Sequence, residues 1–146
     1  MNMYNRALII GKFMPLHKGH TKMIEHAAEI ARLVDVVVLG CKEEPISLIQ
    51  RYNWVSDTYV DVSYIHPMML GFDSNELNAS SESDLQSSID WSEYLKANLK
   101  DFDKYDVIVG SEKYVQYMGE YLGIDYDIFD EERKAVSISA TAIKSD

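Results

Sequence analysis

The chain has 146 residues and a single cysteine, Cys41, which excludes an internal disulfide and a cysteine-rich zinc site. Scarce cysteine is typical of proteins of the reducing cytoplasm, and we expect this protein there. No apolar run approaches the ~20 residues that a membrane-spanning helix needs. The first apolar run ends at Ile10, before Gly11 and Lys12, so we expect neither a signal peptide nor a membrane partner.

Positive charge is also scarce. The chain has 14 lysines and arginines against 24 aspartates and glutamates, which gives a formal net charge of −10. Proteins that grip nucleic acid present a positive surface to its phosphates, so we expect no nucleic-acid partner. An anionic small molecule would need positive charge gathered at one place. The length suits a single domain over residues 1–146.

Short apolar runs that end near a glycine alternate with segments whose apolar residues recur at helical spacing. The runs predict buried strands, and the spaced segments predict helices. We expect strands over 6–10, 36–39, 62–66, 107–109 and 127–129, and helices over 20–33, 46–59, 90–99 and 113–122. This alternation predicts an α/β fold in which helices pack around a parallel sheet. Ligands of such folds bind at the carboxyl ends of the strands.

The segment 67–88 differs in composition from the rest of the chain. It holds six serines and two asparagines, and few large apolar residues follow Phe72. Such a composition is typical of a loop, and we expect a mobile polar loop over this segment. We expect Asp90 to cap the helix that comes after it.

The ten residues after the first predicted strand, G-K-F-M-P-L-H-K-G-H, carry the clearest chemical signal. Gly11 allows a tight turn and Gly19 allows close approach of another group. His17 and His20 stand where a helix begins, and the free N–H groups there attract anions. Lys12 adds a full positive charge. The pattern predicts a phosphate site, although the Walker motif G-x-x-x-x-G-K-[ST] is absent from the sequence.

A zinc site is the alternative for two histidines three residues apart. The other candidate ligands, His26, His66 and Cys41, show no metal-ligand spacing with them. We therefore favour the phosphate site and expect no metal held by protein side chains alone.

The motif H-x-G-H after a first strand resembles the signature of the nucleotidyltransferase superfamily. A second mark of that superfamily, I-S-x-T-x-I-R, is similar to Ile138-Ser-Ala-Thr-Ala-Ile-Lys144 near the other end of the chain. The resemblance implies that Ser139 and Thr141 offer hydroxyls to the β- and γ-phosphates of ATP, with Lys144 one turn later. Lysine lacks the bidentate fork of the arginine that the family more often has at that position.

Most of the chain resembles one branch, the nicotinamide-mononucleotide adenylyltransferases that are fused to ribosylnicotinamide kinase in bacterial bifunctional regulators. The likeness extends from the first motif to R-x-x-W at 51–54, Trp-Ser at 91–92, the helix at 116–123 and D-x-x-R followed by S-I-S over 130–139. It implies a Rossmann-like fold with a five-stranded parallel sheet in the order 3-2-1-4-5 and helices on both faces.

The resemblance also nominates site residues. Catalytic roles fall to Lys12, His17 and His20. Contacts to ATP fall to Gly11, Phe13, Gly19, Ser111, Arg133, Ser139, Thr141 and Lys144, and contacts to the mononucleotide fall to Arg51, Trp54 and Trp91. An indole face suits a flat, cationic nicotinamide ring. For Trp91 a core position is an equal alternative; for Trp54 a core position is favoured, and for Arg51 pairing with an acid is the commoner fate.

The implied reaction joins nicotinamide mononucleotide to the AMP moiety of ATP, giving NAD and pyrophosphate. Mg²⁺ is expected to be held mostly by phosphates and water, with no protein ligand that we can name. Another phosphate-monoester acceptor, such as phosphopantetheine or glycerol phosphate, is one alternative, and a non-catalytic nucleotide-sensing module is another. Symmetric assemblies occur among the relatives, so the resemblance also allows a homo-oligomer.

Overall fold

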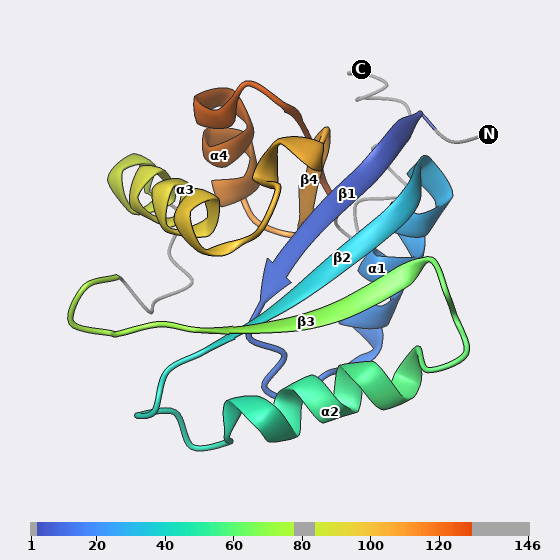
Figure 1. The fold of residues 1–146 in the computed structure, drawn as a ribbon, viewed down its shortest axis with the longest axis vertical. Coiled ribbons are helices and arrows are strands. Elements are labelled where there is room, and N and C mark those ends of the chain that lie inside the picture. Colours follow the sequence, from blue (N-terminus) through green and yellow to red (C-terminus); the bar gives the residue numbers. More distant parts are fainter. Residues whose placement is uncertain (1–2, 78–83, 130–146) are drawn as a thin grey trace.

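The computed structural model describes residues 3–77 and 84–129, in which strands and helices alternate (Figure 1). The elements in chain order are β1 (Tyr4–Gly11), α1 (Lys18–Ile30), β2 (Ala31–Gly40), α2 (Leu48–Thr58), β3 (Ile65–Gly71), α3 (Leu85–Asn98), the 3₁₀ turn η1 (Phe102–Lys104), β4 (Val107–Gly110), α4 (Tyr114–Leu122) and β5 (Asp125–Ile128). The strands pair in parallel in the order β3-β2-β1-β4-β5. The predicted α/β class and strand order are confirmed.

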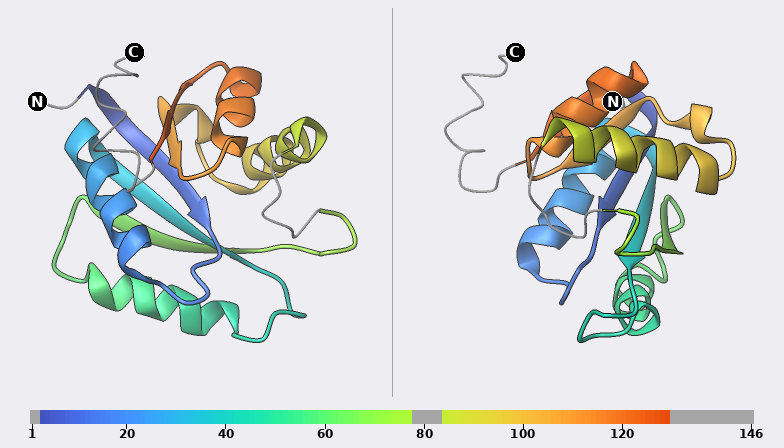
Figure 2. Two further views of the ribbon diagram at one scale, coloured as in Figure 1. Left: turned by 180° about the vertical axis from the view of Figure 1, so that it is seen from behind. Right: turned by 90° about the vertical axis from the view of Figure 1, so that its left-hand side faces the viewer.

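Helices cover both faces of the sheet, with α1 and α2 on one side and α3 and α4 on the other (Figure 2). Successive residues of a strand point to opposite faces, so β1 sends Ala7 and Ile9 into one core cluster and Leu8 and Ile10 into the other. All four side chains are buried. This double burial explains why the strands appear in the sequence as unbroken apolar runs. No helix in the described ranges is long and apolar enough to cross a bilayer.

One predicted boundary is wrong because α1 passes into β2 without a loop. The helix ends at Ile30, and Ala31 is both its C-cap and the first residue of the strand, with φ −131° and ψ 146°. The sequence predicted helix as far as Leu33. Buried Ala31 satisfies the apolar pattern of a helix and that of a strand equally well, so periodicity could not separate them.

The predicted polar loop over 67–88 is also too long at both ends. Its first five residues belong to β3, where Met68 pairs with Val37 of β2. Its last four residues form the first turn of α3, which Asp84 rather than Asp90 caps by accepting a hydrogen bond from Ser87 N at 2.8 Å. The hydroxyl of Ser88 donates to the backbone carbonyl of Asp84, so this serine has a hydrogen-bond partner inside the helix.

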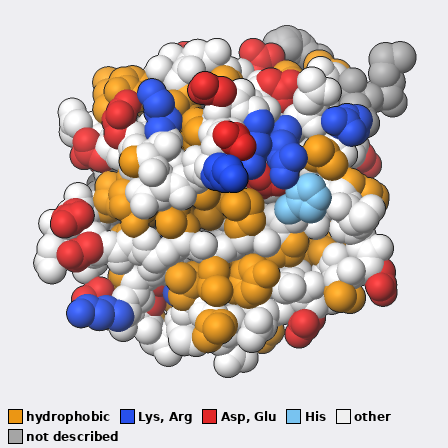
Figure 3. Space-filling model, viewed as in Figure 1, with side chains coloured by type: hydrophobic (Ala, Val, Ile, Leu, Met, Phe, Trp, Pro, Cys, Tyr) orange, Lys and Arg blue, Asp and Glu red, His pale blue; other side chains and the backbone are white. Residues whose placement is uncertain are grey.

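A buried carboxylate, Asp35, joins three elements on the face that carries α3. Its Oδ1 accepts hydrogen bonds from Arg6 Nε at 3.1 Å and Nη2 at 2.7 Å and lies 3.1 Å from His66 Nδ1, while its Oδ2 accepts from the Tyr105 hydroxyl at 2.5 Å. Burial raises the pKa of Asp35, but the hydrogen bonds from Arg6, Tyr105 and His66 outweigh it and leave the pKa lowered. Figure 3 shows basic side chains and a histidine gathered on this face.

We predict that Asp35→Asn lowers the free energy of unfolding by about 2–4 kcal/mol at neutral pH, because Arg6 loses its buried counter-ion. The folded-state pKa of Asp35 lies below its unfolded value, so this stabilisation is present above roughly pH 4 and is lost as the pH falls through the folded pKa. Urea unfolding at pH 7 and pH 3 measures both effects. The exposed Asp57→Asn is the matched control and should change stability by under about 0.5 kcal/mol; equal stability of the two variants would contradict the prediction.

Candidate functional site

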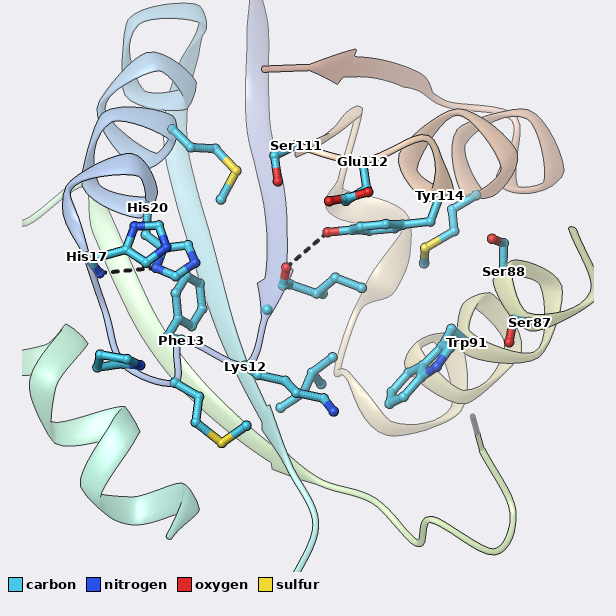
Figure 4. Close-up of a pocket in the computed structure, with 17 residues that line it drawn as sticks. Lys12, Phe13, His17, His20, Ser87, Ser88, Trp91, Ser111, Glu112 and Tyr114 are labelled. Atoms are coloured by element: carbon cyan, nitrogen blue, oxygen red, sulfur yellow. Dashed lines mark hydrogen bonds between the residues drawn. The ribbon is translucent and has the colours of Figure 1, made fainter. Parts of the chain in front are cut away.

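A cavity of about 380 Å³ opens at the carboxyl ends of β1 and β4, where the first turns of α1, α3 and α4 converge. Figure 4 shows His17 and His20 on one side of it and Ser111, Glu112 and Tyr114 on the opposite side, with Trp91 on α3 forming a third wall. This is the edge of the sheet at which a parallel α/β fold binds its ligands.

The loop after β1 is shaped by Phe13. Its backbone has a positive φ of 51° and its side chain is only 2% exposed. The ring closes over Gly11, where an added Cβ would lie 3.1 Å from the ring, and its edge meets the His20 imidazole at a centroid distance of 4.9 Å. Gly11 and Phe13 both line the cavity, and Phe13 also positions His20.

The two histidines of the motif form the N-terminal cap of α1. His17 is the N-cap residue, and its Nδ1 accepts a hydrogen bond from Gly19 N at 3.1 Å. In return, His20 Nδ1 accepts from His17 N at 3.2 Å, which completes a capping box with imidazoles in place of the usual hydroxyl and carboxylate. A capping box pairs the N-cap residue with the third residue of the helix, which explains why the two histidines are three residues apart. With both Nδ1 atoms accepting, the neutral rings carry their protons on Nε2.

The imidazoles stack on each other with ring centroids 3.7 Å apart. Burial and then the neighbouring His17 lower the pKa of His20 to about 4. At neutral pH the His20 ring is therefore an uncharged N–H donor on the cavity wall.

Lys12 and Arg51 share one carboxylate, that of Glu44. Lys12 Nζ lies 2.9 Å from Glu44 Oε2, and Arg51 Nη2 lies 2.7 Å from Oε1. Burial raises the pKa of Glu44, but the hydrogen bonds from Lys12 and from Cys41 N, with the charges of Lys12 and Arg51, leave it lowered. Glu44 is thus ionised and belongs to an ion cluster at the cavity edge.

Arg51 is completely buried and does not line the cavity. Its Nη1 donates to the carbonyls of Lys12 and Leu39, both at 2.9 Å, and its Nε donates to the carbonyl of Ile46 at 3.0 Å. This placement supports the alternative of pairing with an acid, and the predicted nucleotide contact of Arg51 stays a prediction. Gly40 makes the space for it, because a Cβ there would lie 2.5 Å from Arg51 Nη2.

The two tryptophans have different positions. Trp91 lines the cavity and makes T-shaped contacts with two aromatic rings. The distance between ring centroids is 4.9 Å to Phe72 and 5.8 Å to Tyr94. The Tyr94 hydroxyl donates to the carbonyl of Gly71, so this wall is attached to the end of β3. Trp54 lies on α2 and is not among the residues that line the cavity, and its predicted ligand contact stays a prediction.

Sequence reasoning missed several residues of the site. Tyr114 lines the cavity and donates from its hydroxyl to the carbonyl of Ile10 at 3.3 Å. Ser87 and Ser88 also line it, but they were assigned to a loop instead of the start of α3. Asp84, three residues before Ser87, was the available capping signal. Ser111, whose contact to ATP stays a prediction, also lines the cavity.

Four predicted contacts, Arg133, Ser139, Thr141 and Lys144, lie outside the described residues. That these residues lie close to His17 and His20 stays a prediction. Within residues 3–77 and 84–129, no group of three or more His, Cys, Asp or Glu side chains could hold a metal ion.

Solved structures show the same fold. The NadR protein in complex with NAD and AMP-PNP is similar at 23% identity and a TM-score of 0.58, over 99% of this chain and 43% of that one. A bifunctional NMN adenylyltransferase/ADP-ribose pyrophosphatase from Francisella tularensis, complexed with AMP and a manganese ion, is similar at 22% identity and a TM-score of 0.61, over 88% of this chain and 37% of that one.

The chain thus spans about two fifths of the length of these structures. No protein-family model and no curated protein matches it. At this identity the likeness shows the fold, which is the Rossmann-like α/β fold of these NMN-adenylyltransferase-type structures.

We predict that Gly19→Ala displaces the His17 ring, because the added Cβ would lie 3.1 Å from His17 Cε1 and 3.3 Å from Nδ1. Moving this ring uncovers His20, so the pKa of His20 should rise from about 4 toward its ordinary 6.5. An NMR titration of the imidazoles measures this.

Gly123→Ala is the matched control for this substitution. Gly123 has a φ of 75° with nothing within 4 Å of an added Cβ, so the variant should lose about 1 kcal/mol of stability and leave the titration unchanged. An unchanged His20 pKa in Gly19→Ala would contradict the prediction.

Proposed function

We propose that this protein is a nucleotidyltransferase which joins nicotinamide mononucleotide to the AMP moiety of ATP, releasing pyrophosphate and NAD. The observation that carries the proposal is the imidazole cap of α1, which presents two stacked rings to a cavity at the end of the central strand. The positive dipole end of a helix attracts phosphate. Lys12 adds a charge at the same cavity.

In the reaction, an oxygen of the mononucleotide phosphate attacks the α-phosphorus of ATP. The bond from the α-phosphorus to the bridging oxygen breaks, and its electron pair leaves with pyrophosphate. The nucleophile is already an anion, so no covalent enzyme intermediate is needed, and catalysis consists of positioning and charge stabilisation. The Nε2–H groups of His17 and His20 would donate to phosphate oxygens as negative charge moves to the leaving group.

A neutral His20 ring suits this task. Its Nδ1 stays the acceptor for His17 N, and its Nε2–H would donate to a phosphate oxygen. Lys12 would neutralise the polyphosphate. The predicted contacts Arg133, Ser139, Thr141 and Lys144 would complete the triphosphate site. Mg²⁺ would be held by the phosphates, since the described residues offer no cluster of metal ligands.

Trp91 supports the choice of a nicotinamide nucleotide. Its indole is braced by Phe72 and Tyr94 and borders the cavity, where its face would stack on a flat cationic ring. The solved NadR structure holds NAD and AMP-PNP, and the Francisella structure holds AMP and a manganese ion. These ligands belong to those proteins, and we extend their class to this chain by proposal.

A different phosphate-monoester acceptor remains a second candidate, and one observation favours it. Arg51 and Trp54, two of the residues that pointed to nicotinamide mononucleotide, do not line the cavity. The histidine pair would serve phosphopantetheine or glycerol phosphate equally well.

Incubation with ATP and Mg²⁺ and, in separate reactions, nicotinamide mononucleotide, its deamidated form, phosphopantetheine or glycerol phosphate tests the proposal. Separation of the products should show NAD and pyrophosphate. Transfer of AMP to another acceptor would replace the substrate assignment, and nucleotide binding without pyrophosphate release would favour a sensing module.

His20→Ala should retain the fold and lower kcat by about 10²–10³, because one aimed donor is lost from the phosphate site. Steady-state kinetics of pyrophosphate release, with thermal melting as a check of folding, measures this. Glu29→Ala, an exposed change on the same helix, is the control and should keep normal turnover. Near-normal kcat in His20→Ala would refute the role of this histidine.

A further inference from the structure

Glu44 is a nearly buried carboxylate for which the proposed reaction has no direct use. Its side chain is 8% exposed, and it sits between two cations, Lys12, which lines the cavity, and Arg51, which does not. Oε2 faces Lys12 Nζ at 2.9 Å, whereas Oε1 faces Arg51 Nη2 at 2.7 Å and accepts a hydrogen bond from Cys41 N at 3.1 Å.

The two cations differ in their freedom to move. The Arg51 side chain is 0% exposed, and backbone carbonyls hold it in place in addition to Glu44. The Lys12 side chain is 31% exposed, lines the cavity and has a flexible four-carbon stem. If Lys12 turned toward a ligand, Glu44 would keep one fixed counter-ion. That matters because removing the last partner of a buried charge is strongly unfavourable.

We propose that Glu44 is a positioning residue. It holds the Lys12 ammonium near the cavity until a polyphosphate enters and takes Glu44's place as the partner of Lys12. Arg51 remains paired with Glu44 before and after this exchange. The proposal rests on the proposed function, because it assumes that a polyphosphate enters this cavity. Glu44 then competes with the ligand for Lys12. The competition weakens ground-state binding and gives Lys12 a partner to return to when pyrophosphate leaves.

Isothermal titration calorimetry with inorganic tripolyphosphate and with a non-hydrolysable ATP analogue tests this exchange. Glu44→Gln keeps an acceptor for Arg51 and for Cys41 N but removes the competing charge, so both probes should bind about three- to fivefold more tightly. Glu43→Gln is the matched control, with the same change in net charge one residue away. Glu43 is exposed and accepts from the Ser74 hydroxyl at 3.0 Å, so its replacement should change affinity by less than about twofold.

A double-mutant cycle separates competition from a general structural effect. In a Lys12→Met background, Glu44→Gln should no longer tighten binding, because no ammonium is left to release. A change in loop structure would act in both backgrounds. If Glu44→Gln does not fold, Glu44→Asp takes its place, since the shorter carboxylate can remain with Arg51 but is withdrawn from Lys12, and it should also tighten binding.

Unchanged or weaker binding in the folded Glu44 variant, or equal tightening with and without Lys12, would overturn the exchange. If the coupling is found but no dinucleotide forms, the exchange stands and the proposed reaction fails. If the wild-type protein binds neither probe, both fail.

Discussion

The geometry of the cavity depends on the buried guanidinium of Arg51. It joins the carbonyl of Lys12 after β1, the carbonyl of Leu39 in β2 and the carbonyl of Ile46 before α2, and it pairs with Glu44. These groups come from the ends of adjacent strands and from the loop between β2 and α2, and their backbone acceptors would otherwise need water. A single side chain thus fixes the edge of the sheet from which the ligand-facing loop departs.

In the histidine motif, one set of hydrogen bonds both begins a helix and orients two rings at the cavity. The Nδ1 atoms satisfy backbone N–H groups at the start of α1, which orients the rings and assigns their protons to Nε2. The same bonds that begin the helix therefore prepare two donors for a ligand. Phe13 and Gly19 fit around the pair, so the loop before the helix has little choice of conformation.

The sequence predicted what local pattern and charge determine, namely the α/β class and the turn from β1 into α1 with its histidines. It failed where distant residues decide. Arg51 is buried because Gly40 leaves room for its guanidinium and Glu44 neutralises it, and neither relation is visible from helix periodicity. The start of α3 was missed because Ser87 and Ser88 have the composition of a loop, although Asp84 caps them as a helix.

The two sides of the cavity are attached to different strands of the sheet. The histidines follow β1, which pairs with β2 on one side and β4 on the other, whereas the Trp91 wall is attached to β3, which among the described strands pairs with β2 alone. A strand bonded along one edge is displaced at lower cost than a central one. On the proposed function, the side that would hold the phosphates thus continues from the central strand, and the side that would hold the acceptor is tied through Tyr94 to an edge strand.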